Sequence, residues 1–351
     1  MKGMLLTCAG VSRYMKKWLN PKHGKFNVSL KDRLSVFFHG FIPDNAVFYN
    51  FKKYNRKDFL TDVEMYTKAI KINKGYTELI NNKLVFTDFM KNTVRMAPTI
   101  GYFSKGKVVY LDGSNVCATP CEFFDKMGNQ WSYMIKKFDA GSGEGIYKIS
   151  RNENEFFLNE KAISKEELGA KMGRLNNYMI SEVVEQAEYA KKIFSKTANT
   201  VKFYTLIDPD TEEAFMPAAC HRFGSERSLP VDNVGKGACL AKIDVDTGVM
   251  TSVYLVRDRK LSWITNHPDT GAQIEGVCIP NFQEAKKQML EIHNSMKYIK
   301  YIAWDVVMQD DGFVLLEGNA NTDMAGIQPF EPFLLNPRVR RFYQYHGVIN
   351  R

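Results

Sequence analysis

The sequence predicts an α+β protein, because helical and antiparallel strand patterns occupy different stretches of its 351 residues. Short amphipathic helical patterns fill residues 1–98. From residue 200 onward, apolar runs alternate with turns rich in Asp, Pro and Gly, which is typical of antiparallel hairpins. The clearest helix covers residues 282–298, and its apolar face consists of Phe282, Ala285, Met289, Ile292 and Met296.

In the N-terminal part, the patterns predict several short helices. Thr61 is the expected N-cap of a helix over residues 61–72, with Glu64 in the capping-box position. A further helix over residues 81–98 ends before Pro98. In residues 31–41 the apolar side chains at helical spacing are Leu34, Phe37, Phe38 and Phe41. We interpret them as a stripe that faces the core, and a basic aromatic helix lying on a membrane is the alternative.

The rest of the chain alternates mainly between strands and turns. Before residue 190, the expected strands cover residues 106–111, 131–138, 144–150 and 178–184, and a helix covers residues 164–175. Two hairpins follow, in which residues 200–207 pair with 213–223 and residues 238–244 pair with 249–256. This order predicts mainly antiparallel sheets.

The net charge is the unusual part of the composition. Lys and Arg number 48 and Asp and Glu 39, which gives +9. Residues 1–110 hold 20 of the basic and 7 of the acidic residues, so this third carries +13 and the remainder −4. Such a basic third favours an anionic partner, such as nucleic acid, a lipid surface or an acidic ligand. Lysines that only form a solvated face are the alternative.

Cysteines and apolar runs limit the cellular context. Six cysteines are spread over the chain without the spacing of a zinc site or a disulfide framework, so we expect free thiols in a reducing compartment. No apolar run reaches the 18 residues of a membrane-spanning helix. The opening MKGMLLTCAG is too short in its apolar part for a secretory signal. These features predict a cytoplasmic protein.

The first motif with chemical content is the glycine-rich stretch KFDAGSGEGI. Between its two expected strands lie Gly141, Ser142, Gly143 and Gly145. Glycines there allow backbone N–H groups to turn toward phosphate oxygens without a Cβ in the way, and Lys137 adds a positive charge. No GK[ST] closes the loop and no helix follows it, which excludes the nucleotide P-loop and the dinucleotide fingerprint. A plain glycine hairpin is the alternative.

The second motif is the hairpin IAWDVVMQDDGFVLLEGNANTD. A three-residue loop ending at Gly312 would place Gln309 opposite Phe313 and Asp305 opposite Glu317. Strand alternation then puts three oxygen-bearing side chains on one face: Asp305, Glu317 and Asn319. Such a set suits Mg²⁺ held together with nucleotide phosphates, and the apolar neighbours indicate central strands, where unpaired carboxylates are costly. A solvated face is the alternative.

The third motif is the loop HRFGSERSLPVDNVGKG in residues 221–237. Arg222 at its start is a candidate for bidentate contact with a phosphate or a carboxylate. Ordinary turn chemistry is the alternative. The histidines show no ligand spacing, and no GxSxG or Cys–His pair points to a nucleophile.

In this order, the pieces resemble the ATP-grasp superfamily, and more narrowly its sugar-transfer-associated proteins, which are encoded with capsular and exopolysaccharide genes. The resemblance covers residues 80–332 and rests on NNKLVF, IKKFDAGSGEGI, ISEVVEQ, ANTVKFYTLI, HRFG with VDNVGKGA, and AWDVV with LLEGNAN. It implies an ATP-grasp fold, in which two α+β subdomains clasp ATP. The expected division is a basic, partly helical N-terminal region over residues 1–94, a lid over 95–180 and a core with the metal site over 181–351.

The resemblance also implies a role for each candidate residue. Nucleotide phosphates would be bound by Lys83 and Lys137, under a flexible lid formed by Gly141, Ser142, Gly143 and Gly145. The adenine amino group would donate to Glu182, with backbone contacts from Val183 and Val184. One or two Mg²⁺ ions, which Mn²⁺ can replace, would be held by Asp305, Glu317 and Asn319. The catalytic residues would be Arg222 and Lys202, with Arg222 on the γ-phosphate or the substrate carboxylate.

The implied activity is that of an ATP-dependent carboxylate–amine ligase that forms an amide through an acyl phosphate. Its small-molecule substrates would be an amino acid or amine and a sugar acid or amino sugar of a surface polysaccharide. Ala303 stands where several peptide-forming relatives have an Arg, so a phosphotransferase acting on a sugar hydroxyl stays open as an alternative. A non-enzymatic basic binding protein is a further alternative, against which the carboxylate pair and the glycine loop argue. No nucleic-acid partner is expected, whereas the basic third would contact an anionic glycan or the inner face of the membrane.

Overall fold

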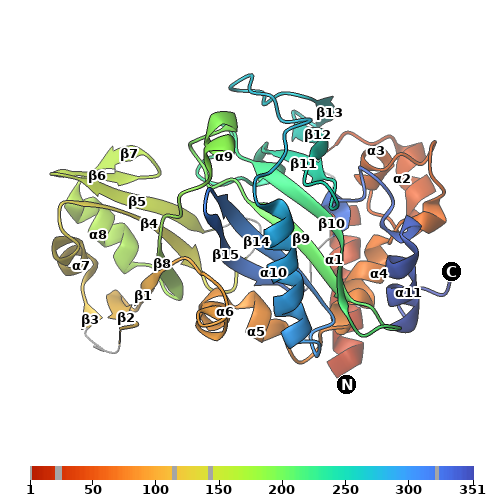
Figure 1. The fold of residues 1–351 in the computed structure, drawn as a ribbon, viewed down its shortest axis with the longest axis horizontal. Helices are drawn as coiled ribbons and strands as arrows, with labels where there is room; N and C mark the ends of the chain where they lie inside the picture. Colours follow the sequence, from red (N-terminus) through yellow and green to blue (C-terminus); the bar gives the residue numbers. More distant parts are fainter. Residues whose placement is uncertain (1, 20–25, 113–116, 141–144, 321–323) are drawn as a thin grey trace.

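The structure is a computed structural model of the chain, and it describes residues 2–19, 26–112, 117–140, 145–320 and 324–351. In this part of the chain, two antiparallel sheets lie side by side, and helices pack on their faces (Figure 1). The α+β prediction is therefore confirmed. No described helix is both long and apolar enough to cross a bilayer.

The first sheet has eight strands in the order β3-β2-β1-β8-β4-β5-β6-β7. Its strands are β1 (Thr99–Ser104), β2 (Lys107–Tyr110), β3 (Cys117–Ala118), β4 (Gln130–Lys137), β5 (Ile146–Asn152), β6 (Glu155–Leu158), β7 (Lys161–Ile163) and β8 (Tyr178–Glu182). Helices α7 (Pro120–Lys126) and α8 (Lys165–Gly173) pack on this sheet. There Phe123 and Leu168 share a core with Ile135 and Ile180.

The second sheet has seven strands in the order β13-β12-β11-β10-β9-β14-β15. Its strands are β9 (Val201–Ile207), β10 (Ala214–Phe223), β11 (Cys239–Ile243), β12 (Met250–Arg257), β13 (Lys260–Ile264), β14 (Tyr301–Gln309) and β15 (Gly312–Asn319). Eight successive residues of β14 are buried, because this central strand is covered on both faces. That double covering explains the nearly continuous apolar run in its sequence.

One face of the second sheet is covered by α5 (Thr77–Asn81), α6 (Lys83–Met90) and α10 (Phe282–Ser295). The apolar face expected for α10 is confirmed, since all five of its residues are buried. The single helix expected over residues 81–98 is wrong. Helix α6 begins at Lys83 behind the N-cap Asn82, but it ends at Met90, where the N–H groups of Thr93 and Val94 turn back to the carbonyl of Met90.

The other face carries the N-terminal helices and the last helix. These are α1 (Lys2–Leu19), α2 (Leu30–Phe37), α3 (Asn45–Phe48), α4 (Asp62–Thr67) and α11 (Pro337–Tyr345), while α9 (Glu188–Ile193) follows the connection from β8. Phe41 and Phe48 share a core with Tyr204 and Tyr254 of the sheet, so the N-terminal region is part of the same packed body.

Two predictions for the N-terminal helices have different outcomes. The capping box of Thr61 and Glu64 at the start of α4 is confirmed. The core-facing stripe in residues 31–41 is wrong for Leu34 and Phe38, which are exposed, although Phe41 is buried. Helix α2 buries the side of Val36 instead, and it ends at Phe37 with Phe38 as an αR C-cap, so Phe41 lies beyond the helix.

The core packing of α10 yields a stability prediction. Met289 is fully buried in the shared core, whereas Lys287 on the same helix is exposed. We expect Met289→Ala to lower the free energy of unfolding by about 2–5 kcal/mol, because a cavity remains. The matched control Lys287→Ala should change it by less than about 0.5 kcal/mol. Urea denaturation measures both values, and equal effects of the two substitutions would contradict this packing.

Candidate functional site

A cavity of about 340 Å³ lies between the two sheets, next to the connection from β8 to α9. The first sheet contributes Met134, Lys136, Ile146 and Lys148 to its wall. The second sheet contributes Arg222, Asp305, Leu316 and Glu317, and the remaining lining comes mainly from residues 182–186, 195–198 and 230–233. The volume is that of a small-molecule site, and a junction between two subdomains is a common place for one.

The hairpin of β14 and β15 brings the expected carboxylates together, but by a different route from the expected one. Gln309 pairs with Gly312, so the turn has two residues and the expected pairing of Gln309 with Phe313 is wrong. A register shift between Asp305 and the next residue corrects for this difference, so Asp305 lies opposite Glu317 as predicted. A bulge of this kind re-aims a side chain.

Asp305 is the centre of an ion-pair cluster on the floor of the cavity. Lys202 Nζ lies 2.6 Å and Arg222 Nη2 3.3 Å from Asp305 Oδ1, and Asn319 Nδ2 donates to Oδ2 at 3.3 Å. Burial alone would raise the pKa of Asp305, but the charges of Arg222 and Lys202 outweigh it and hold this pKa below its usual range. Asp305 is therefore a buried, ionised carboxylate.

Arg222 has a second carboxylate partner, which the sequence motifs did not single out as a site residue. Its Nε lies 3.4 Å from Asp232 Oδ2, which also accepts hydrogen bonds from the backbone N–H (2.9 Å) and the hydroxyl of Thr200. Burial raises the pKa of Asp232, although Arg222 opposes the shift. The guanidinium is thus held between Asp232 on one side and Asp305 on the other.

The donor set fits a hard divalent cation. Asp305, Glu317 and Asn319 bring two carboxylates and an amide oxygen to one face of adjacent strands, and oxygen ligands of this kind are those that Mg²⁺ prefers. The buried Oδ1 of Asp305 is held by Lys202 and Arg222, whereas Oδ2 faces the amide of Asn319. A metal ion bound by Asp305 would therefore share this carboxylate with Lys202 and Arg222.

Lys83 connects three parts of the structure. Its side chain is buried, and Nζ donates to the carbonyl of Ala140 at 2.6 Å and lies 3.2 Å from Glu317 Oε2. The helix α6 therefore places a cation between β15 and the segment that precedes the glycine-rich stretch. Gly141, Ser142 and Gly143 lie outside the described residues, and Gly145 has a positive φ of 63°.

Lys136 rather than Lys137 lines the cavity. The two residues end β4 and their side chains point to opposite faces, as strand alternation requires. Lys137 Nζ lies 3.5 Å from Asp139 Oδ1. Lys137 is not among the described residues that line the cavity. Burial lowers the pKa of Lys136, while Glu317 opposes the shift. Alternation with the buried Ile135 was the sequence signal that could have identified Lys136.

The connection after β8 supplies the far end of the cavity. Glu182, Val183 and Val184 all line it, as their expected contact with an adenine ring requires. The N–H of Glu182 donates to the carbonyl of Pro98 at 2.9 Å, which ties this connection to the start of β1. Lys148 on β5 also lines the cavity, although no sequence motif indicated it. Its Nζ lies 2.6 Å from Glu160 Oε1.

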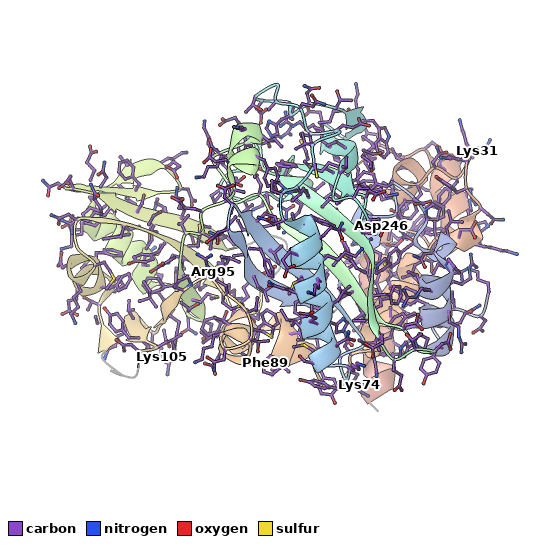
Figure 2. The ribbon with its side chains drawn as sticks, in the orientation of Figure 1. Lys31, Lys74, Phe89, Arg95, Lys105 and Asp246 are labelled. Atoms are coloured by element: carbon purple, nitrogen blue, oxygen red, sulfur yellow. The ribbon has the colours of Figure 1, made fainter. Side chains whose placement is uncertain are left out.

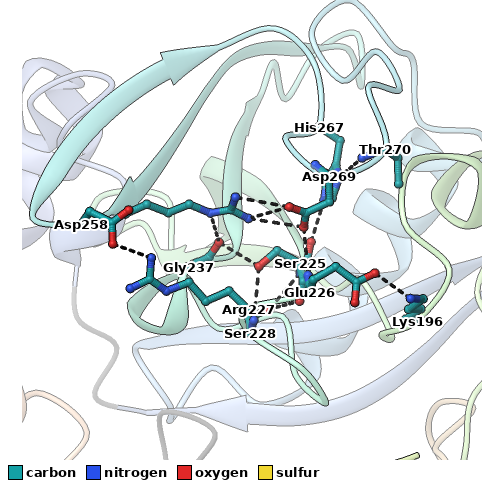
Figure 3. A network of polar contacts seen from close by, with 12 residues as sticks. Lys196, Ser225, Glu226, Arg227, Ser228, Gly237, Asp258, His267, Asp269 and Thr270 are labelled. Atoms are coloured by element: carbon teal, nitrogen blue, oxygen red, sulfur yellow. Dashed lines mark hydrogen bonds and ion pairs between the residues drawn. The ribbon is translucent and has the colours of Figure 1, made fainter.

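A network of polar contacts fixes the loop that carries Asp232 (Figure 3). Ser225 Oγ donates to the carbonyl of Gly237 at 3.0 Å, which closes the loop on itself. Arg257 Nε donates to the same carbonyl at 3.3 Å, and its guanidinium lies 3.2 Å from Asp269. The loop is therefore anchored to β12 and to the segment after β13, which keeps Asp232 in place beside Arg222.

His221 is hydrogen-bonded to the backbone of Arg222. Its ring is fully buried and stacks on Phe223 with 4.1 Å between ring centroids. Nδ1 faces the carbonyl of Arg222 at 3.1 Å and so carries the proton, and Nε2 accepts from the hydroxyl of Tyr189 at 2.8 Å. Burial lowers the pKa of His221 to about 3.

Comparisons with known proteins give one family match. A family model described as sugar-transfer associated ATP-grasp matches residues 64–342. No curated protein matches the chain. Similar solved structures include a biotin carboxylase–β-γ-ATP complex from Campylobacter jejuni, with a TM-score of 0.41 and 8% identity over 78% of this chain and 47% of that one. The D-alanine–D-alanine ligase from Helicobacter pylori has a TM-score of 0.40 and 11% identity over 76% of this chain and 61% of that one. The pyruvate carboxylase from Rhizobium etli has a TM-score of 0.37 and 14% identity over 72% of this chain and 16% of that one. The chain thus spans less than two thirds of the length of each of these three proteins.

The buried His221 predicts a component of acid sensitivity. Its pKa is about 3 in the folded state against 6.5 for an ordinary histidine, so the unfolded state takes up this proton first as the pH falls. The contribution to stability is complete above pH 6.5 and is lost below it, at about 1.4 kcal/mol per pH unit. His221→Gln keeps a donor and an acceptor but does not titrate. Denaturant unfolding between pH 7 and 5 should therefore show a smaller loss of stability for the variant, and identical slopes would contradict the buried neutral histidine.

Proposed function

The chain belongs to the sugar-transfer-associated ATP-grasp family, and from this premise we propose that it is an ATP-dependent ligase that joins a carboxylate to an amine. The observation that carries the proposal is the cavity on which Lys136, Arg222, Asp305 and Glu317 converge. A cleft with basic groups and a fixed carboxylate pair suits a triphosphate bound with a divalent cation.

In this proposal the nucleotide extends from the β8 connection to the ion-pair cluster. Glu182, Val183 and Val184 contact adenine, and Lys83 and Lys136 bind phosphates. The lid in residues 95–180 closes over the triphosphate with its glycine-rich stretch. When bound, Mg²⁺ held by Asp305, Glu317 and Asn319 neutralises charge on the triphosphate.

The proposed reaction has two steps. A carboxylate oxygen of the first substrate attacks the γ-phosphorus in line, the bond to the β-phosphate oxygen breaks, and ADP leaves. The amine then attacks the carbonyl carbon of the acyl phosphate, phosphate leaves and an amide forms. Arg222 orients the substrate carboxylate, and Lys202 balances charge beside Asp305. Closure of the lid excludes water, which would otherwise hydrolyse the acyl phosphate.

A phosphotransferase is the second candidate, and Ala303 favours it. This residue lies two positions before Asp305 on β14 and is fully buried, so β14 offers no cation next to the carboxylate cluster. In the ligase, Arg222 on β10 has to supply the charge that stabilises acyl transfer. In the phosphotransferase, a sugar hydroxyl attacks the γ-phosphorus and no such charge is needed.

ADP release with defined substrates tests the proposed activity. We expect release only when a carboxylate and an amine are both present, with the amide in the product, and amino acids and sugar acids are the first compounds to try. Asp305→Asn should lower turnover by at least about 100-fold, because it removes a fixed negative charge from the site. If a sugar is phosphorylated without a second substrate, the phosphotransferase is the correct assignment and the ligase is not. Undiminished turnover of a folded Asp305→Asn variant would contradict the site itself.

Nucleotide affinity separates the two neighbouring lysines of β4. Hydrogen bonds to charged groups contribute about 1.5–3 kcal/mol, so Lys136→Met should raise the Kd for ATP about 10- to 150-fold. Lys137→Met is the matched control, and we expect less than about a threefold change because exposed ion pairs contribute little. Calorimetric titration of ATP into each variant measures both constants. A larger effect at Lys137 would support Lys137, and not Lys136, as the phosphate-binding residue.

A further inference from the structure

Helix α2 is apolar on two sides, and one of them faces solvent. Val36 is buried against the rest of the N-terminal region. On the outer side, Leu30, Leu34 and Phe38 recur every four residues and are 71%, 48% and 80% exposed. Residues four apart lie above one another on a helix, so these side chains form one stripe. We call them the α2 stripe.

The end of α1 lies against α2 and adds to the exposed apolar surface. Arg33 Nη2 donates to the carbonyl of Trp18 at 2.9 Å, and the rings of Trp18 and Phe37 lie 4.9 Å apart in an edge-to-face contact. These contacts fix α1 beside α2. Leu19, the last residue of α1, is 76% exposed. Exposed apolar side chains are ordinary one at a time, but a contiguous group of them marks an interaction surface.

The charge around the α2 stripe indicates what covers it. Helix α2 carries Lys31 and Arg33 beside a single acidic residue, and Arg56 donates to the carbonyl and the hydroxyl of Ser35 on this helix. The aspartate, Asp32, accepts a hydrogen bond from the hydroxyl of Ser29 at the start of α2. Lys16 and Lys31 are exposed, and Lys31 projects from the outer edge of the molecule (Figure 2). An apolar stripe with a basic border complements an anionic surface, whereas pairing with a second copy would bring like charges together.

We propose that the α2 stripe binds the surface of an anionic phospholipid bilayer. Leu30, Leu34 and Phe38 enter the boundary between headgroups and acyl chains, and lysines such as Lys31 contact the headgroup phosphates. Helix α2 lies at the opposite end of the molecule from the eight-stranded sheet, so this contact leaves the cavity between the sheets accessible (Figure 1). The inference goes beyond the proposed activity and does not depend on it.

Vesicle sedimentation of the full chain tests this proposal. The probes are vesicles of phosphatidylcholine with phosphatidylglycerol and vesicles of phosphatidylcholine alone. We expect the wild type to bind the anionic vesicles and not the neutral ones. The double substitution Leu34→Ser with Phe38→Ser should lower the partition constant at least about tenfold, because it removes the apolar contact. Lys31→Glu should lower it about fivefold or more.

A matched control excludes a general effect of surface polarity. Leu111 and Leu335 are 47% and 42% exposed and lie outside the N-terminal region, so replacing both with Ser should leave vesicle binding unchanged. Circular dichroism checks that every variant is folded, which we expect because the replaced side chains are on the surface.

Several results would overturn the proposal. The wild-type protein could fail to bind vesicles, or it could bind neutral and anionic vesicles equally. The variant with Leu34→Ser and Phe38→Ser could also bind as strongly as the wild-type protein. A concentration-dependent dimer in sedimentation velocity that this variant abolishes would assign the stripe to self-association instead. The assay contains no nucleotide, so these outcomes leave the proposed ligase activity untouched.

Discussion

The buried carboxylate of Asp305 is the constraint on which the rest of the site depends. A charge in a sheet covered on both faces is costly unless opposite charges lie beside it. Lys202 occupies the paired position across β9 and β14, and Arg222 reaches the same oxygen from β10. The registers of four strands, including the bulged β15, must therefore be correct together for this one group to remain ionised.

The two walls of the cavity are built differently, and this difference suits a nucleotide enzyme. The core wall is rigid, because Arg222 lies between two carboxylates and the loop with Asp232 is anchored by its own hydrogen bonds. The other wall comes from strands β4 and β5, and the glycine-rich stretch connects them. Lys83 contacts both sides through Ala140 and Glu317. In the proposed reaction, charges fixed on one side would receive a triphosphate that the other side covers.

Local patterns in the sequence predicted the elements that local physics determines. The apolar face of α10 and the capping box of Thr61 follow from helix period and capping chemistry. The pairing of Asp305 with Glu317 was predicted from a three-residue turn, and it holds only because the bulge in β15 offsets the observed two-residue turn. The bulge in β15 could not be predicted, because it depends on packing against the neighbouring strand. Lys136 and Lys137 are adjacent basic residues, and only the alternation with the buried Ile135 distinguishes the one that faces the cavity. Asp232 becomes a site residue only because the loop after β10 folds back and brings it to Arg222.

The position of a divalent cation in the nucleotide-bound protein is the most direct measurement of the proposed site. Crystals grown with ATP and Mn²⁺ give an anomalous scattering peak wherever the metal binds. We expect the peak beside the carboxylates of Asp305 and Glu317, next to the triphosphate in the cavity between the sheets. Bound nucleotide with the peak elsewhere, or with no peak, would contradict the assignment of these residues to the metal.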